Sequence, residues 1–483
     1  MRLPVVCLLI LLTGKLGLAA TPLSPEQRRL NLESFEYVWA TIRDKHWDPK
    51  IGGLDWQSVH DELRPRVESA QTVEEARQIV ASMLDRLQQT HFGVIPADAY
   101  EAIGDNGETS GGNHGQTGID LRILGGRAIV SSIMPNSPAQ ETGVRTGWEI
   151  VRIGKTDVAP LIATIAEGTG HSRLTDMMSS RSILSKLDGS TSSEVAVEFS
   201  DINGKQIGKH LKRRVESGDL TTFGFLPPML VNFNAKKLPG DGGGDFEYIH
   251  FNLFLKPDLV VTRFGEAIHD CGHCPGVIID LRGNPGGLGA MAMGMAGFLI
   301  SKPDQKLGTM YMRSLPIRFV IFPRPEVFEG PVAVLVDSFT ASTSEIFAGG
   351  LQDLKRARVF GERTAGAALP SRIERLPNGD GFQYAMANYI SESGRQLEGN
   401  GVIPDVDVPP DRKSLSEGKD AVLEAALNWL LTQAKVQGKP HAKAQVERRG
   451  SAGSIAIVPK TSNLVNGGPP AIQSSLPSGR LGR

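Results

Sequence analysis

The segment that decides the fold is VAVLVDSFTASTSE, residues 332–345. Its first five residues are apolar without alternation, which is typical of a parallel strand covered on both faces. A polar turn follows, and then an apolar run for which we expect a helix over residues 344–354. Residues 277–287, VIIDLRGNPGG, repeat this arrangement before an expected helix over residues 290–299. Two such units predict an α/β core whose turns lie at the carboxyl edge of one sheet.

The turn at residues 337–345 contains the candidate nucleophile. A serine between a buried strand and a helix N-terminus lies in a positive local potential, and backbone N–H groups there can bind an oxyanion. Ser342 and Ser344 both occupy such a place. Ser344 is better suited to be the helix N-cap, with Glu345 in the first helical turn. For Ser342, a simple helix-start serine is the alternative to a role in catalysis.

Outside this core, the chain divides by composition. Apolar residues at helical spacing predict a helical domain, in which Thr72 and Glu75 form a plausible capping box. A glycine-rich stretch follows, and then short β segments that a helical insertion over residues 160–188 interrupts. The expected division is a signal peptide at 1–20, a helical domain at 24–96, a linker at 97–116, a β domain at 117–215, an α/β core at 216–434 and a disordered basic tail at 435–483.

The β segments resemble a PDZ domain. The stretch Gly118-Ile119-Asp120-Leu121 falls where PDZ domains place their carboxylate-binding loop. There, backbone N–H groups would converge on a terminal carboxylate while the peptide adds a strand to the sheet edge. A β-rich spacer that binds nothing is the alternative.

Four short blocks in the second half of the chain resemble, in order, those of the tail-specific or C-terminal processing protease superfamily, peptidase family S41. They are DLRGNPGG at 280–287, ASTSE at 341–345, GERTAG at 361–366 and EGNGVIPD at 398–405. With the PDZ-like segment, the resemblance covers most of residues 24–434. It implies a crotonase-like sheet with helices in the core, and serine peptidase activity on polypeptides without a metal or an organic cofactor.

The resemblance assigns roles by position. Ser342 becomes the nucleophile, and the oxyanion donors become the N–H groups of Thr343 and of Gly286 or Gly287. Many family members use a lysine as base, but the matching position here is Ala367. A serine hydroxyl without a base is a poor nucleophile at neutral pH.

A second branch of the superfamily, with tricorn-like and chlamydial-protease-like members, uses serine with histidine and glutamate. The block LQQTHFG at 87–93 resembles the place of that histidine, which makes His91 the candidate base. Glu398 is the only carboxylate of the late block before Asp405, and it is the candidate acid that orients His91. The structural alternatives are a helix-end histidine bonded to a backbone carbonyl and a solvent-facing turn glutamate.

The N-terminus has the layout of a secretory signal. Arg2 precedes the apolar run LPVVCLLILL at 3–12, and small residues follow at 17–20. We therefore expect an exported protein, periplasmic or secreted, with no membrane span after signal removal; an uncleaved anchor is the alternative. A formal net charge of -1 gives no argument for nucleic acid as a partner. Nothing in the sequence indicates the subunit count.

Cys271 and Cys274 are the cysteines that remain once the signal is removed. Their CxxC spacing is found in redox proteins, but a redox pair opens a helix, whereas a strand-like run follows here. We expect a disulfide or an inert thiol pair. A metal site with His269 and His273 has compatible residue types but no second ligand cluster.

The leading hypothesis is thus an exported serine endopeptidase with a PDZ domain. The absence of a lysine at Ala367 motivates an alternative of another class, a catalytically inactive S41-like protein that binds peptides. A CxxC redox protein is a third hypothesis.

Overall fold

The computed structural model describes residues 23–97, 114–169, 173–215, 218–221, 229–240, 244–272 and 274–437. The predicted signal peptide, most of the predicted linker and the chain after residue 437 lie outside these ranges. None of the described helices has the length and apolar character that crossing a bilayer requires.

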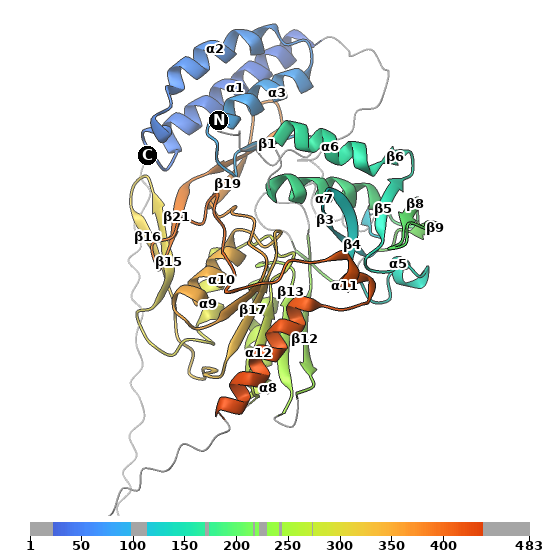
Figure 1. Cartoon of the computed structure of the whole chain (residues 1–483). Helices are drawn as coiled ribbons and strands as arrows, with labels where there is room; N and C mark the ends of the chain where they lie inside the picture. The colour runs from blue at the N-terminus through green and yellow to red at the C-terminus, as the bar shows by residue number, and fades with distance from the viewer. Residues whose placement is uncertain are drawn as a thin grey trace, which may run out of the picture. The chain divides into compact units, whose positions relative to one another are not determined.

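Three helices open the described chain (Figure 1): α1 (Pro25–Lys45), α2 (Trp56–Ser69) and α3 (Val73–Asp85). A short 3-10 turn, η1 (Ile51–Gly53), lies between the first two. Each helix begins at a side-chain cap, provided by Ser24, Asp55 and Thr72. Thr72 accepts from the Glu75 N–H at 3.0 Å as predicted, but the Glu75 carboxylate accepts from the N–H of Gln71, one residue before the cap.

These helices share their apolar core with a small sheet from the far end of the chain. Strand β1 (Gly93–Ile95) pairs antiparallel with β20 (Gly381–Ala385), which pairs with β19 (Ser371–Arg375). Phe35 and Met83 of the helices belong to the same buried cluster as Phe382 and Tyr384. The segment that carries His91 is therefore fixed between the helices and the later part of the chain.

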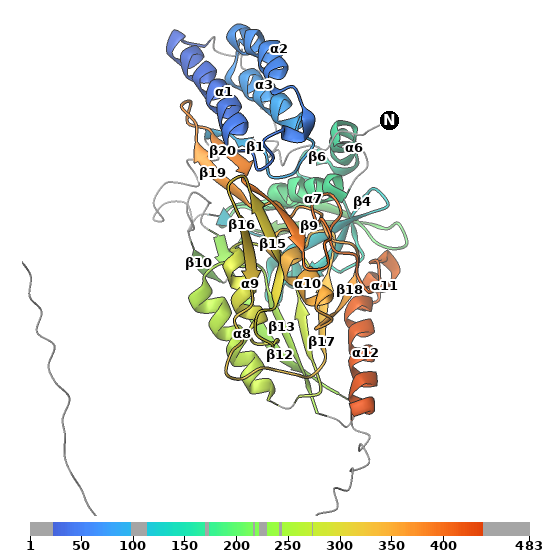
Figure 2. The ribbon, with the colours of Figure 1, turned by 90° about the vertical axis from the view of Figure 1, so that its left-hand side faces the viewer.

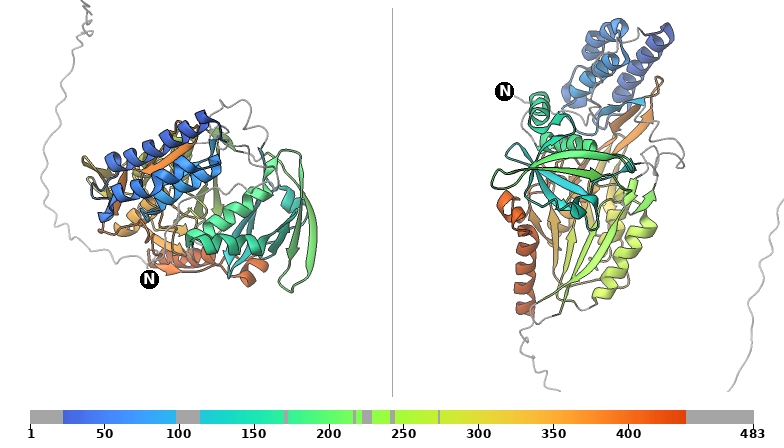
Figure 3. Two further views of the ribbon diagram at one scale, coloured as in Figure 1. Left: turned by 90° about the horizontal axis from the view of Figure 1, so that it is seen from above. Right: turned by 90° about the vertical axis from the view of Figure 1, so that its right-hand side faces the viewer.

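The β segments of the PDZ-like region form a sheet in the order β3-β4-β5-β8-β9, with β6 beside β5. The bounds are β3 (Ile119–Leu124), β4 (Arg127–Ile133), β5 (Glu149–Ile153), β6 (Thr156–Asp157), β8 (Glu194–Ser200) and β9 (Gln206–Lys212), with the pair β2 (His114–Gly115) and β7 (Gly189–Ser190) beside it. The predicted insertion is two helices, α6 (Val158–Thr169) and α7 (Arg173–Leu187). They lie against the sheet in Figure 3, and α7 packs on β3, an edge strand.

The α/β core contains a six-stranded sheet in the order β12-β13-β14-β17-β18-β22. Its strands are β12 (Phe233–Leu238), β13 (Phe246–Phe251), β14 (Val277–Asp280), β17 (Val332–Val336), β18 (Arg358–Gly361) and β22 (Val406–Asp407). From β13 to β22 all neighbours are parallel, which confirms the predicted α/β class.

Side chains from both faces of β14 and β17 are buried. Val277, Ile279 and Val334 belong to the apolar cluster that includes α8 (Pro257–Cys271), α9 (Gly289–Ala296) and α10 (Thr343–Asp353). Ile278 and Leu335 face the cluster of α12 (Ala421–Gln437), so helices cover both sides (Figure 2). This burial explains why both runs are apolar without alternation.

Smaller elements complete the core. They are the hairpin strands β15 (Lys306–Met312) and β16 (Pro316–Val320), strand β21 (Ala387–Ser391), the pair β10 (Asp219–Thr221) and β11 (Met229–Val231), and the short helices α5 (Pro138–Glu141) and α11 (Arg412–Ser416). Helix α12 begins at Ala421, where Asp420 accepts the Leu423 N–H and caps the helix.

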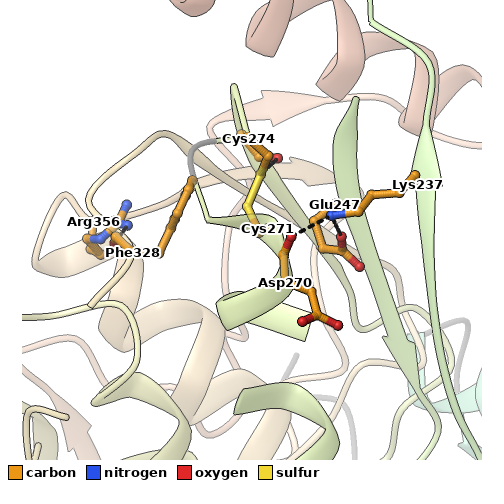
Figure 4. The surroundings of a disulfide bond; sticks show 8 residues. Lys237, Glu247, Asp270, Cys271, Cys274, Phe328 and Arg356 are labelled. Carbon is orange, nitrogen blue, oxygen red and sulfur yellow. Dashed lines mark hydrogen bonds and ion pairs between the residues drawn. A yellow bond between two sulfur atoms is a disulfide. The ribbon is translucent and has the colours of Figure 1, made fainter. Parts of the chain in front are cut away.

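Cys271 and Cys274 form a disulfide (Figure 4). It joins the last residue of α8 to the approach of β14, and Gly272 between them has φ 54°. Close by, the Lys237 ammonium contacts the Glu247 carboxylate at 2.6 Å and donates to the Asp270 carbonyl at 3.2 Å. The sequence predicted either a disulfide or an inert thiol pair, and the structure contains the disulfide.

Candidate active site

The turn that follows β17 is held by Asp337. One of its carboxylate oxygens accepts, at 3.0 Å each, from the N–H groups of Phe339 and Thr340 in the same turn and of Gly283 in the turn after β14. The Ala341 N–H also donates to the Asn284 carbonyl at 3.1 Å. The turns after β14 and β17 therefore meet at one sheet edge, where parallel strands place their carboxyl ends.

Ser342 lies at the end of this turn and is the N-cap of α10, with φ 54° and ψ -119°. The prediction that Ser344 is the N-cap was wrong, because the helix begins at Thr343. Ser344 is instead fully buried and its hydroxyl donates to the Asn284 side chain at 2.9 Å. A non-glycine residue at positive φ is strained, and such strain is concentrated at functional sites.

A fully buried carboxylate, Glu345, clamps the backbone around Ser342. One oxygen accepts from the N–H groups of Ser342 at 2.9 Å and Ala367 at 3.0 Å. The other accepts from the Thr364 hydroxyl at 2.6 Å and the Gly366 N–H at 2.8 Å. Burial raises the pKa of Glu345 to about 7, and the four donors oppose that rise. The segment 364–367 is thereby fixed against Ser342.

Ala367 is thus a direct neighbour of Ser342 in space, since its carbonyl accepts the Ser342 N–H at 2.8 Å. Its methyl group is buried in a small apolar cluster with Ala365, Ala341 and Met177. A methyl group has no basic atom, so the base must come from another segment.

Glu398 and Thr90 meet beside this segment, although they are 308 positions apart in the sequence. One Glu398 oxygen accepts the Thr90 N–H at 2.8 Å, and the other accepts the Thr90 hydroxyl at 3.0 Å and the Ala368 N–H at 3.1 Å. The Thr90 hydroxyl lies 2.8 Å from Nδ1 of His91. A continuous chain of hydrogen bonds therefore runs from Glu398 through Thr90 to His91.

This chain fixes which nitrogen of His91 carries the proton. An ionised carboxylate only accepts hydrogen bonds, so the Thr90 hydroxyl donates to Glu398. The same hydroxyl must then accept from His91, which places the imidazole proton on Nδ1. Nε2 keeps its lone pair and is the atom that could remove a proton from a hydroxyl. Thr90 is the residue that sequence reasoning missed, because a threonine next to a histidine has no distinctive pattern.

Ser342 and His91 belong to one connected neighbourhood. Ala367 accepts from the Ser342 N–H, and the next residue, Ala368, donates to Glu398. In the described structure, however, no hydrogen bond joins the His91 ring to the Ser342 hydroxyl. Catalytic hydrogen bonds are often long without substrate and tighten when it binds.

The surroundings of His91 keep its imidazole neutral. The residue itself has φ 61°, another strained backbone position. Burial is the larger cause that lowers the pKa of His91 to about 4, and the positive charge of Arg181 on α7 lowers it further. His91 itself is partly exposed to solvent. Burial also raises the pKa of Glu398, while the donors from Thr90 and Ala368 lower it.

The predicted oxyanion donors differ in availability. The Gly286 N–H donates to the Asn284 side chain at 2.9 Å and is already engaged. In the described structure the N–H groups of Gly287 and Thr343 have no protein acceptor. A Cβ on Gly286 would lie 2.8 Å from the Cβ of Ser342, so this glycine is needed for the close approach of the two turns. The geometry favours Gly287 and Thr343 as the pair that could bind an oxyanion.

The PDZ-like segment reaches the nucleophile turn through Arg122 of β3. Its guanidinium is buried and donates to the second oxygen of Asp337 at 2.6 and 3.0 Å. It also donates to Asp120 at 2.9 Å. This contact spans 215 positions of sequence and was not predicted.

The predicted carboxylate loop shows both open and occupied groups. Gly118 has φ 79°, and a Cβ there would overlap Ser137. Ile119 and Asp120 pair with β4, while the Leu121 N–H donates to the Asp120 side chain at 2.9 Å. Since β3 is an edge strand, no strand of the described sheet pairs with its other side. Among the described residues, no three His, Cys, Asp or Glu side chains are grouped as metal ligands would be.

Two family models match parts of this chain. Residues 245–408 match the model of peptidase family S41. The core of this chain therefore resembles the S41 peptidases. Residues 31–85, in the helices that precede His91, match the tricorn protease C1 domain.

Curated relatives of this chain include carboxyl-terminal-processing peptidases and a putative tricorn protease homolog. This chain is 23% identical to the chloroplastic carboxyl-terminal-processing peptidase 3 of Arabidopsis thaliana, over 76% of this chain and 67% of the relative. It is 25% identical to a carboxyl-terminal-processing protease of Synechocystis, over 84% and 87%. A putative tricorn protease homolog of Streptomyces coelicolor is 24% identical, over 83% of this chain but 32% of that longer protein.

Two solved structures share the fold. The photosystem II D1 C-terminal processing protease has a TM-score of 0.55 at 20% identity, covering 82% of this chain and 98% of that one. Mature CPAF has a TM-score of 0.60 at 15% identity, covering 85% and 99%. The predicted resemblance to family S41, the α/β core and the class of serine-type peptidase are confirmed.

Proposed function

We propose that this chain is an exported serine endopeptidase that cleaves polypeptides through an acyl-enzyme on Ser342. The observation that carries the proposal is the hydrogen-bonded chain from Glu398 through Thr90 to His91, because it leaves Nε2 of His91 as a base. This base would replace the amine that the family's lysine supplies, which Ala367 cannot.

In the first half of the reaction, Nε2 of His91 takes the Ser342 proton as the serine oxygen attacks the peptide carbonyl carbon. The carbonyl π electrons move to its oxygen, and the N–H groups of Gly287 and Thr343 stabilise that oxyanion. When the C–N bond breaks, His91 gives the proton to the leaving amine and an ester on Ser342 remains. Glu398 stabilises the transient imidazolium through Thr90.

In the second half, water attacks the ester. His91 removes a proton from this water, the C–O bond to Ser342 breaks, and the proton returns to the serine oxygen. Burial keeps His91 in its neutral form, which is the form that can accept a proton. When His91 becomes an imidazolium, the negative charge of Glu398, joined to it through the Thr90 hydroxyl, compensates the positive charge. Each step uses only groups of this chain, the substrate and water.

The PDZ-like domain would recruit or gate polypeptide substrates. The free side of β3 could receive an extended peptide, whose carboxylate would approach Gly118-Ile119-Asp120-Leu121. Arg122 lies in the same strand and bonds Asp337, which shapes the Ser342 turn. Peptide binding at β3 would therefore act on Ser342 through the ion pair of Arg122 with Asp337 and the turn that Asp337 holds. The N-terminal sequence supports export, with a periplasmic or secreted mature protein that has no membrane span.

Labelling of the mature protein with a fluorophosphonate probe tests the proposal. We expect labelling of the wild type, none of Ser342→Ala, and at least about 100-fold slower labelling of His91→Ala. Labelling that survives Ser342→Ala would remove Ser342 as nucleophile. A wild type that is not labelled but binds unfolded peptides would support the inactive peptide-binding protein.

A further inference from the structure

Strand β12 forms one edge of the six-stranded sheet, and no described strand pairs with its outer side. The Asn252 N–H donates to the Asn232 carbonyl at 3.3 Å, so residue 232 directs its backbone toward β13. Backbone direction alternates along a strand, and Phe233, Ala235 and Lys237 therefore direct their N–H and C=O groups away from β13. Among the described residues, none bonds these outward groups, so the edge is open.

The two lysines of β12 are held against their own sheet. Exposed lysines often protect an edge strand from pairing with another chain. Here the Lys237 ammonium contacts the Glu247 carboxylate on the neighbouring strand at 2.6 Å (Figure 4). The Lys236 ammonium lies 5.0 Å from the centre of the Tyr248 ring. Neither lysine is therefore directed across the edge.

A groove of about 400 Å³ lies between β12 and α8. The residues of α8 that line it are Arg263, Glu266, Ala267 and Asp270, at the spacing of neighbours on one helix face. The side chains of Arg263 and Asp270 are exposed, and no described residue forms an ion pair or a side-chain hydrogen bond with either of them. The groove thus has a positive end at Arg263 and a negative end at Asp270.

The middle of this helix stripe lies level with the middle of β12. Strand β12 is antiparallel to β13, and α8 returns the chain between the parallel strands β13 and β14, so β12 and α8 run in the same direction. The Lys237 ammonium donates to the Asp270 carbonyl at 3.2 Å, which places these two residues near one level. Ala235 is ~7 Å back along the strand, a distance that corresponds to about four or five residues of helix. The level of Ala235 is therefore near Glu266, between Arg263 and Asp270.

We propose that a second copy of this chain pairs antiparallel with the β12 edge, around a two-fold axis at Ala235, and so joins two six-stranded sheets into one. In this register Ala235 pairs with Ala235 of the partner subunit, and Phe233 pairs with Lys237 of the partner subunit. All the outward backbone groups of β12 then form hydrogen bonds. An axis at Lys236 would place two lysines opposite each other, and an axis at Asn234 would leave Lys237 without its partner strand.

The same axis matches the charges of α8. Because the axis passes near the level of Glu266, Arg263 lies opposite Asp270 of the partner subunit, and Asp270 lies opposite Arg263 of the partner subunit. An unrelated extended peptide could use the open backbone groups, but a second copy also supplies these charges in the matching order. The two Glu266 carboxylates approach each other near the axis, and their repulsion makes the dimer weak and reversible.

The proposed dimer leaves each Ser342 site complete within one copy. A two-fold axis perpendicular to the joined sheet reverses the strand direction of the second copy. The carboxyl edges of the two copies, which carry the Ser342 turns, therefore lie at opposite ends of the joined sheet. Dimerisation is thus independent of the proposed peptidase activity.

Sedimentation velocity over a range of protein concentrations measures the Kd of the dimer. Ala235→Pro removes an outward N–H but keeps the ladder with β13, which uses the neighbouring residues. Ala235→Ser keeps the N–H and is the matched control. We expect Ala235→Pro to raise Kd by at least about tenfold and Ala235→Ser to leave it within about threefold of wild type.

Charge exchange tests the axis without a change in the strand. Arg263→Glu and Asp270→Lys should each raise Kd by at least about tenfold, because each places two like-charge pairs across the interface. An equimolar mixture of these two variants restores both opposite-charge pairs, so it should form a mixed dimer with nearly the wild-type Kd. Glu266→Gln should lower Kd, since it removes the repulsion at the axis.

A wild type that remains monomeric at about 0.5 mM would overturn the proposal. A dimer whose Kd is unchanged in Ala235→Pro and in both charge variants would also overturn it, because such a dimer would use another surface. Circular dichroism monitors folding, and if Ala235→Pro does not fold, the charge variants and their mixture decide. Fluorophosphonate labelling should be equally fast in the wild type and in Ala235→Pro; a wild type without labelling would remove the proposed function and leave the dimer result unaffected.

Discussion

Removal of the Thr90 hydroxyl is the most direct test of the candidate mechanism. Thr90→Val keeps the branched shape of the side chain but removes the oxygen that joins Glu398 to His91. Two hydrogen bonds are lost, of 3.0 Å to Glu398 and 2.8 Å to His91. The Nδ1 proton of His91 then has no acceptor, so neither its tautomer nor its ring orientation is fixed.

The magnitude follows from these two contacts. A hydrogen bond to a charged group contributes about 1.5–3 kcal/mol, and here it acts when His91 becomes an imidazolium. A loss of ~3 kcal/mol in the transition state corresponds to a fall in kcat of roughly 100-fold. Glu398 keeps its two backbone donors, from Thr90 and Ala368, so the free energy of unfolding should fall by only ~1–2 kcal/mol.

The assays are the rate of fluorophosphonate labelling and the hydrolysis of an unfolded protein such as casein, with urea denaturation as the measure of stability. Thr90→Ser retains the hydroxyl and is the matched control, with an expected rate within about threefold of wild type. If Thr90→Val reacts as fast as Thr90→Ser while both remain folded, the link between Glu398 and His91 has no catalytic role.

Three further perturbations have defined outcomes. NMR titration should show that His91 stays neutral down to about pH 5; its signal is the one that disappears in His91→Ala. In Arg181→Gln the pKa of His91 should rise, because a positive charge is removed. It should still stay below the ordinary value of about 6.5, because burial remains. A midpoint at or above the ordinary value would contradict this electrostatic environment. Gly287→Ala should reduce kcat by at least about 100-fold, because Gly287 has φ 144° and a Cβ there would overlap the backbone of Phe254. An unchanged kcat would exclude the Gly287 N–H as an oxyanion donor. Replacing both Cys271 and Cys274 by Ser should lower the free energy of unfolding by ~2 kcal/mol, as expected for so short a loop, with activity retained; lost activity in a folded variant would revive the redox hypothesis.

The sequence predicted well the parts of the molecule that local physics decides. Continuous apolar runs at 277–281 and 332–336 indicate strands buried on both faces, and the structure has β14 and β17 there. Parallel neighbours must place their following turns at one edge, so the meeting of the Asn284 and Ser342 turns follows from the pattern. Capping was less certain, because several serines near a helix start compete and only the backbone dihedrals decide among them.

Tertiary structure alone decided which distant groups meet. Thr90 and Glu398 are 308 positions apart, and Arg122 and Asp337 are 215 apart. No local periodicity encodes such pairs, because they depend on how the helices pack on β19 and β20 and on how the PDZ-like sheet lies against the core. The sequence by itself therefore determined the fold class and the position of the turn that carries Ser342, because strand burial acts locally. The link from Glu398 through the Thr90 hydroxyl to His91 exists only where distant segments of the chain come together.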